Sequence, residues 1–127
     1  MGGNNSTGSN PYMNPVEVSV DNNTVTVAEN EGVAEILIDD VTGGKYTLHT
    51  SEGYLAGGDK KLDINGTVES TWGISFDDDQ AVITWTSGNT NYAIQYNSSS
   101  PRFACYSSSQ AKVCLYEKNE YDLTING

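Results

Sequence analysis

Residues 91–118, NYAIQYNSSSPRFACYSSSQAKVCLYEK, decide the fold class of this chain. Apolar and aromatic residues alternate with small or polar ones over residues 92–97, and two further short apolar runs follow at 103–106 and 113–116. Serine-rich breaks separate the three runs. A period of two between such breaks is typical of short antiparallel β-strands. The stretch therefore predicts three consecutive strands.

The same pattern continues toward both ends of the chain. Valine alternates with polar residues over 16–20, residues 21–23 make a turn and residues 24–27 return, which predicts a β-hairpin. A helical turn competes only at 33–39, where the Ile-Leu-Ile run favours a strand. We expect no helix and about twelve short strands: 16–20, 24–27, 34–38, 45–49, 54–56, 62–64, 71–76, 81–85, 92–97, 103–106, 113–116 and 121–125.

Three windows share one pattern of strand, polar or acidic turn, and second strand ending near a threonine. They begin at Ala34, Thr71 and Ala111, so their starts are 37 and 40 residues apart. Twelve strands with such a period are typical of a closed three-fold architecture. We therefore expect an all-β fold, a closed β-trefoil-like barrel. A β-sandwich is the alternative, because the same strand spacing suits it.

The length of 127 residues suits one domain with a single hydrophobic core, so residues 1–127 are expected to form one all-β unit. Residues 1–15 are rich in Gly, Asn and Ser and predict a flexible lead. Residues 119–127 hold a possible boundary strand at 121–125. In a closed barrel the first and last strands are neighbours, so Met1 and Gly127 should lie at the same end of the domain.

Charge and hydropathy limit the classes of partner. Seventeen acidic and six basic side chains give a net charge of −11. Such a surface repels phosphate backbones, so nucleic-acid binding is not expected. No apolar run approaches the roughly 20 residues that a membrane-spanning helix needs, so membrane insertion is not expected.

Three segments carry a family resemblance: residues 46–58 (YTLHTSEGYLAGG), the Trp-x-Ile pattern at Trp72 with its acidic turn, and residues 92–118. They resemble a family of small all-β domains found, often near the C-terminus, in secreted or surface multidomain proteins of gut Bacteroidota. The resemblance covers residues 16–118 and implies a secreted or cell-surface location; it brings no catalytic residues. The most specific matches are Ile94, Tyr96, Asn97, Ser98, Ser99, Phe103, Tyr106, Gln110, Leu115 and Tyr116.

The chain departs from this family at both ends. Family members usually open with an aromatic hairpin that precedes a segment similar to residues 1–5, and here nothing precedes Met1. Residues 119–127 are similar to the lead-in to that hairpin. These departures favour a domain cut at a shifted point, with neighbouring copies of the same domain as partners in a tandem array.

The residue pattern predicts no catalytic centre. His49 is the only histidine, and the sequence assembles no nucleophile and orienting group around it. A catalytic carboxylate pair could arise among seventeen acids only by chance. We therefore expect a protein that is not an enzyme and has no cofactor.

The acidic turn Asp77, Asp78 and Asp79 is the candidate metal site. Its oxygens could bind Ca²⁺, together with Asp39 and Asp40 of the equivalent turn, because hard cations take six to eight oxygen ligands. Three consecutive carboxylates point in different directions, so a solvated turn is the competing interpretation.

The aromatic residues divide into core and contact candidates. Trp72 and Trp85 would suit sugar stacking if exposed, but they alternate with apolar residues and so favour the core. Tyr12 and Tyr106 fall on polar stretches or opposite an apolar face, and they are the candidate ligand-binding residues. We expect the following side chains to be largely buried: Trp72, Ile74, Phe76, Ile83, Trp85, Ile94, Phe103 and Leu115.

Cys105 and Cys114 bracket the turn at 107–112. In a symmetric hairpin they would lie opposite each other, with Cβ atoms about 4 Å apart, which suits a disulfide. Two small buried thiols are the alternative. Secretion would favour the bond.

The composition and the resemblance favour a non-catalytic binding or adhesion module whose target is a glycan or a surface protein. The β-rich, acidic and Tyr-rich composition fits such a module. The alternative is a structural repeat or spacer of a surface fibre, a tandem array or a phage decoration, which the shifted domain ends favour.

Overall fold

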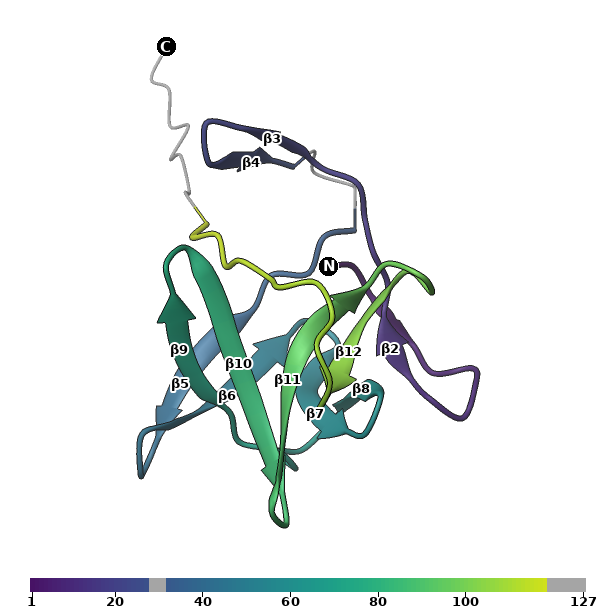
Figure 1. Cartoon of the computed structure of the whole chain (residues 1–127), viewed down its shortest axis with the longest axis vertical. Coiled ribbons are helices and arrows are strands. Elements are labelled where there is room, and N and C mark those ends of the chain that lie inside the picture. The colour runs from purple at the N-terminus through teal and green to yellow at the C-terminus, as the bar shows by residue number, and fades with distance from the viewer. Residues whose placement is uncertain (28–31, 119–127) are drawn as a thin grey trace.

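The computed structural model describes residues 1–27 and 32–118, and these residues contain strands, turns and loops but no helix (Figure 1). The all-β prediction is confirmed. The strands of the described residues are β1 (Asn4–Asn5), β2 (Tyr12–Met13), β3 (Ser19–Asp21), β4 (Thr24–Thr26), β5 (Leu37–Val41), β6 (Lys45–Thr50), β7 (Gly53–Gly58), β8 (Lys61–Asn65), β9 (Gly73–Asp77), β10 (Gln80–Ser87), β11 (Thr90–Asn97) and β12 (Arg102–Tyr106).

The strands form three antiparallel sheets. The largest has the order β1-β2-β12-β11-β10-β9, the second has the order β5-β6-β7-β8, and β3 and β4 form a separate hairpin. The two larger sheets lie one behind the other in Figure 1, as in a sandwich. Within the described ranges no sheet closes on itself, so the β-trefoil-like barrel is not confirmed and the sandwich alternative fits.

Backbone hydrogen bonds join the two larger sheets to each other. The N–H of Tyr46 donates to the carbonyl of Trp72 over 2.9 Å, and the N–H of Trp72 donates to the carbonyl of Tyr46 over 2.8 Å. On the other side, the N–H of Lys60 donates to the carbonyl of Cys105 over 2.9 Å. These links hold the sheets together around one core, whose buried residues are Met13, Leu48, Leu55, Leu62, Trp72, Ala81, Ile83, Ile94, Ala104, Cys105 and Tyr106.

Of the eight predicted core residues, three are buried, four are partly buried and one is exposed. Trp72, Ile83 and Ile94 are buried. Phe76 is 64% exposed, so its predicted burial is wrong. It pairs with the buried Ala81 and faces the core side, but β9 is the edge strand of its sheet and the turn follows at once. The other predicted core residues are partly buried and pack against the core: Ile74, Trp85, Phe103 and Leu115.

Residues 1–15 are part of the fold, which corrects the prediction of a flexible lead. β1 pairs with β2, and Met13 of β2 pairs with Phe103 of β12. Met13 is fully buried, and the N–H of Gly2 donates to the carbonyl of Asn14 over 2.7 Å. The Gly- and Asn-rich composition suggested a loop, but these residues cover the edge that β12 would otherwise expose.

The predicted hairpin near residues 16–27 is confirmed in a shorter form. In the pairing of β3 with β4, Ser19 lies opposite Thr26 and Asp21 lies opposite Thr24. Asn22 and Asn23 connect them with φ values of 50° and 62°, the left-handed conformation that a two-residue type I′ turn needs. The hairpin stands apart from the two larger sheets in Figure 1.

The three repeated windows do not fold alike. The first two form the hairpins β5–β6 and β9–β10. In the third window, residues 113–116 do not pair with β12, because β2 already occupies that edge of the sheet. The predicted strand at 121–125 and the predicted position of Gly127 lie outside the described residues.

Residues 111–113 instead lie between β10 and β11. These two strands pair next to their connecting turn and part further along. In the gap, Ala111 exchanges two backbone hydrogen bonds of 3.0 Å with Tyr96 of β11, and the carbonyl of Val113 accepts one of 2.8 Å from Ala81 of β10. This insertion shapes the site described next.

Candidate functional site

The two predicted ligand-binding tyrosines do not form a common exposed site. Tyr12 is half-buried; the guanidinium carbon of Arg102 lies 3.8 Å from its ring centroid, and its hydroxyl accepts a hydrogen bond of 3.0 Å from Asn5. Tyr106 is only 7% exposed, and its hydroxyl accepts one of 3.1 Å from Asn97. Little of the Tyr106 side chain is open to a partner, because the chain after β12 folds back over this face of the sheet.

The acidic turn gathers no further ligands. Asp77, Asp78 and Asp79 are all exposed at the β9–β10 turn, and Asp78 has a φ of 56°. Asp39 and Asp40 lie in β5 rather than in a turn. Among residues 1–27 and 32–118, no three His, Cys, Asp or Glu side chains are grouped so that they could hold a metal ion. Calcium binding stays a prediction.

The predicted disulfide is not formed. Cys105 is buried opposite Ile94, whereas Cys114 is exposed. The expected hairpin between their strands is absent. Residues 111–113 lie beside β11, but on the side opposite to β12. Burial raises the pKa of the Cys105 thiol to about 12, so this thiol stays protonated and unreactive at neutral pH.

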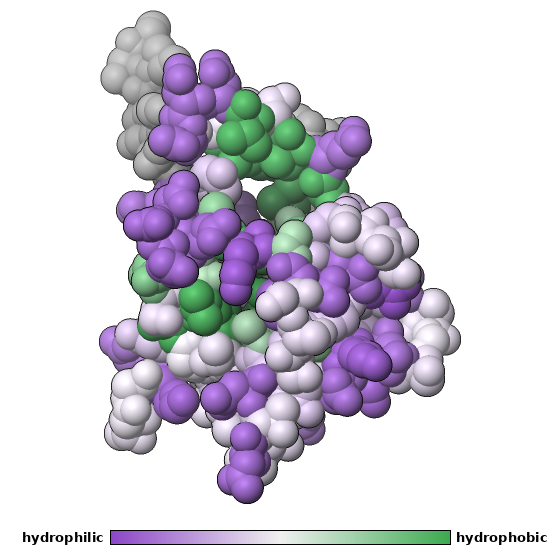
Figure 2. Space-filling view, in the orientation of Figure 1, coloured by the Kyte–Doolittle hydropathy of each residue, from purple (hydrophilic) through white to green (hydrophobic). Residues whose placement is uncertain are grey.

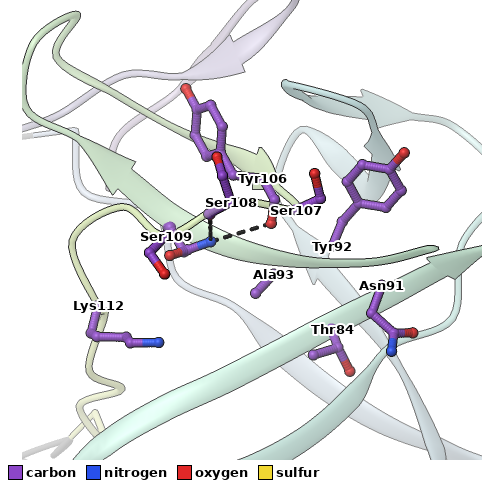
Figure 3. A pocket seen from close by; sticks show the side chains of 10 residues that line it. Thr84, Asn91, Tyr92, Ala93, Tyr106, Ser107, Ser108, Ser109 and Lys112 are labelled. Atoms are coloured by element: carbon purple, nitrogen blue, oxygen red, sulfur yellow. Dashed lines mark hydrogen bonds between the residues drawn. The ribbon is translucent and has the colours of Figure 1, made fainter.

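A polar hollow lies where residues 111–113 enter the sheet (Figure 3). Ile83 and Ile94 face the core, so strand alternation places Thr84, Ala93 and Gln95 on the opposite, outer face. These three residues form the floor. The hollow has a volume of about 180 Å³, and its remaining lining residues are Asn91, Tyr92, Tyr106, Ser107, Ser108, Ser109 and Lys112.

Gln95 fixes the serine-rich wall of the hollow. Its side-chain amide nitrogen donates to the carbonyls of Tyr106 (3.2 Å) and Ser108 (2.9 Å), and its amide oxygen accepts a 2.7 Å hydrogen bond from the N–H of Gln110. Gln95 is 6% exposed. Because one buried side chain satisfies three backbone groups, the wall is held in one conformation.

Hydrogen-bonding side chains lie on two opposite sides of the hollow's floor. In Figure 3 the side chain of Lys112 extends over the hollow from the side opposite to Thr84 and Asn91, and Ala93 leaves the floor low between them. The alternation that turns Val113 toward the core turns Lys112 outward. The described residues contain one ion pair, Lys118 with Glu35, so the ammonium group of Lys112 is not neutralised by a carboxylate of the described chain.

A second groove is apolar. Pro15, Val16, Glu17, Tyr96, Pro101 and Phe103 line about 490 Å³ near the separate hairpin. The rings of Tyr96 and Phe103 lie 5.1 Å apart in a tilted arrangement. Figure 2 shows apolar surface gathered over the β3–β4 hairpin, where Val20 is 58% exposed. This groove has a single charged lining group, Glu17, and offers fewer hydrogen bonds than the polar hollow.

The remaining aromatic and imidazole candidates do not line the polar hollow. Trp72 is fully buried, and its indole N–H donates to the carbonyl of Leu55 over 3.3 Å. Trp85 packs against Tyr92, with ring centroids 5.3 Å apart. His49 stacks on Tyr54 with ring centroids 4.4 Å apart and an interplanar angle of 22°. None of these three lines the polar hollow of the described chain.

No protein-family model matches this chain, and no curated protein and no solved structure matches it either. The part of the chain that the structure describes contains no helix long and apolar enough to cross a membrane.

Sequence reasoning missed the residues that build the hollow. Ser107, Ser108 and Ser109 were visible as a polar turn, and Tyr106 was a candidate for another reason. Gln95 and Lys112 gave no signal, because a Gln at an outward strand position and a Lys in a turn are ordinary surface residues. Only the insertion of residues 111–113 between β10 and β11 brings them together.

Proposed function

We propose that this protein is a non-catalytic binding module of a secreted or surface protein, and that its polar hollow binds a sugar residue of a glycan. One observation carries the proposal: a prearranged hollow on the outer face of β10 and β11 is lined by hydroxyl, amide and ammonium groups. Such groups exchange hydrogen bonds with sugar hydroxyls. The family resemblance supports the extracellular setting.

The charge of the hollow favours a carboxylated sugar. The chain carries a net charge of −11, so most of its surface repels anions. Lys112 places an ammonium group beside the hydroxyls of the hollow, where it can donate charge-assisted hydrogen bonds to a carboxylate. No carboxylate or imidazole lines the hollow in the described residues, which supports binding rather than acid–base chemistry.

Calorimetric titration with D-glucuronate and D-glucose tests this proposal. A hollow of about 180 Å³ holds one sugar ring at most, so we expect millimolar affinity for glucuronate, about 4 kcal/mol of binding free energy. Lys112→Gln should weaken glucuronate binding about fivefold and leave glucose binding unchanged, because a partly exposed ion pair contributes about 1 kcal/mol. Ala93→Phe should abolish binding of both sugars by filling the floor.

Lys61→Gln is the matched control. It removes the same charge from an exposed position in β8, outside the hollow. Equal weakening by Lys112→Gln and Lys61→Gln would show a general charge effect and contradict the proposal. So would unchanged glucuronate binding by a folded Ala93→Phe variant, with folding checked by circular dichroism.

The structural spacer remains the other candidate from the sequence. It rests on the similarity of residues 119–127 to the lead-in of the aromatic hairpin with which family members open, and these residues lie outside the described ones. The described residues supply no observation that favours it over binding.

A further inference from the structure

β5 is an edge strand whose outer side is open. It pairs with β6 only, and no backbone hydrogen bond joins its outer side to another segment of residues 1–27 or 32–118. All five of its residues are exposed, including Leu37 at 59%, Ile38 at 40% and Val41 at 37%. An exposed apolar edge of this kind can pair with a further strand.

The hydrogen bonds of β6 show which backbone groups of β5 face outward. Tyr46 uses both its N–H and its carbonyl for Trp72, away from β5, so its pair with Asp40 is a non-hydrogen-bonded one. Hydrogen-bonded and non-hydrogen-bonded pairs alternate along an antiparallel ladder. Ile38 and Asp40 therefore direct their N–H and carbonyl groups to the open edge, whereas Asp39 directs its own groups toward β6.

The side chains of β5 define the kind of strand that fits. Leu37, Asp39 and Val41 lie on one face, and Ile38 and Asp40 lie on the other. An antiparallel partner would bring apolar side chains opposite the three aliphatic residues and would need positive charges opposite the two aspartates. The net charge of −11 on the whole chain also favours a positively charged partner.

The same charges disfavour two obvious occupants. Full-length antiparallel pairing of two β5 strands places Asp39 opposite Asp39 of the second copy, which is a repulsive pair. Residues 119–127, with the sequence NEYDLTING, contain two acids and no base, so their charges do not match the edge. A second copy and this segment are thus outcomes of the test rather than the expected partners.

We propose that the β5 edge binds an extended peptide strand that carries lysine or arginine opposite Asp39 and Asp40 and apolar residues beside them. Binding adds a fifth strand to the sheet β5-β6-β7-β8, with hydrogen bonds to the backbone of Ile38 and Asp40. This interaction surface is separate from the polar hollow, and the proposal does not depend on sugar binding.

The probe is the blocked heptapeptide Thr-Val-Lys-Lys-Val-Val-Thr, whose antiparallel register matches lysines to Asp40 and Asp39. Binding is followed by ¹⁵N NMR, with amide hydrogen exchange at each residue. We expect the probe to slow exchange of the outward N–H groups of Ile38 and Asp40. The peptide Thr-Val-Lys-Lys-Pro-Val-Thr keeps the charge but lacks one backbone donor, so it should bind about tenfold more weakly.

Two variants separate backbone pairing from charge. Asp40→Pro removes an outward N–H and leaves the β5–β6 hydrogen bonds intact, so the fold should persist and the probe should bind about tenfold more weakly. Asp40→Asn removes only the charge and should weaken binding about threefold. Equal binding of both peptides would overturn the proposal, and so would unchanged binding by folded Asp40→Pro. Dimers, or protection of Ile38 and Asp40 without the probe, would assign the edge to a second copy or to residues 119–127 and overturn it as well.

Discussion

Trp72→Ala is expected to lower the free energy of unfolding by about 3–5 kcal/mol, the cost of removing a fully buried tryptophan. Trp72 has no exposed surface and is the largest fully buried side chain of the described residues. Its backbone exchanges two hydrogen bonds with Tyr46, so it also lies where the two larger sheets meet. The substitution leaves a cavity at this junction, and the carbonyl of Leu55 loses its indole partner.

Urea denaturation of the variant measures this loss. Phe76→Ala is the control, since Phe76 lies in the following strand and is 64% exposed. It should cost less than about 1 kcal/mol. Similar losses for the two variants would contradict the assignment of Trp72 to the core and Phe76 to the surface.

Gln95→Leu is expected to cost about 2–4 kcal/mol and to loosen the wall of the polar hollow. The leucine fills a similar volume but leaves the carbonyls of Tyr106 and Ser108 and the N–H of Gln110 without their side-chain partner. Each buried group left unpaired costs about 1–3 kcal/mol, and water reaches the exposed serine loop in part. Amide exchange over residues 107–110 should become faster even where the variant stays folded.

Gln80→Leu is the matched control for this loss. Gln80 lies in β10, its side chain forms no hydrogen bond within the described residues, and the same replacement there should change stability by less than about 0.5 kcal/mol. Equal stability losses, or unchanged exchange over 107–110 in Gln95→Leu, would contradict the role of Gln95 as the support of the hollow.

The fold class was predictable because alternation and turn chemistry are local signals. Val20, the Asn22–Asn23 turn and the alternation at 92–97 each correspond to a hairpin or strand of the structure, whereas Val16 and Val18 lie before β3. Burial at Trp72, Ile83 and Ile94 followed from the same period of two. Strand pairing between distant segments was not predictable, because period-two alternation does not specify the partner.

The misread segments are those whose partners are far along the chain. Residues 1–15 have a loop-like composition, but Met13 is buried against β12, some 90 residues later. Cys105 and Cys114 flank a turn, but residues 111–113 pass to the other side of β11. The site depends on that same crossing, so Lys112 and Gln95 could not be recognised from their neighbours in the sequence.

The outer face of β10 and β11 is the proposed sugar-binding surface. Titration of ¹⁵N-labelled protein with D-glucuronate, followed residue by residue by NMR, tests it most directly. We expect saturable shifts confined to the lining of the polar hollow, strongest at Ala93, Ser109 and Lys112 and absent at Phe103 of the apolar groove. Shifts that centre on the apolar groove, or no saturable shift at several millimolar sugar, would contradict it.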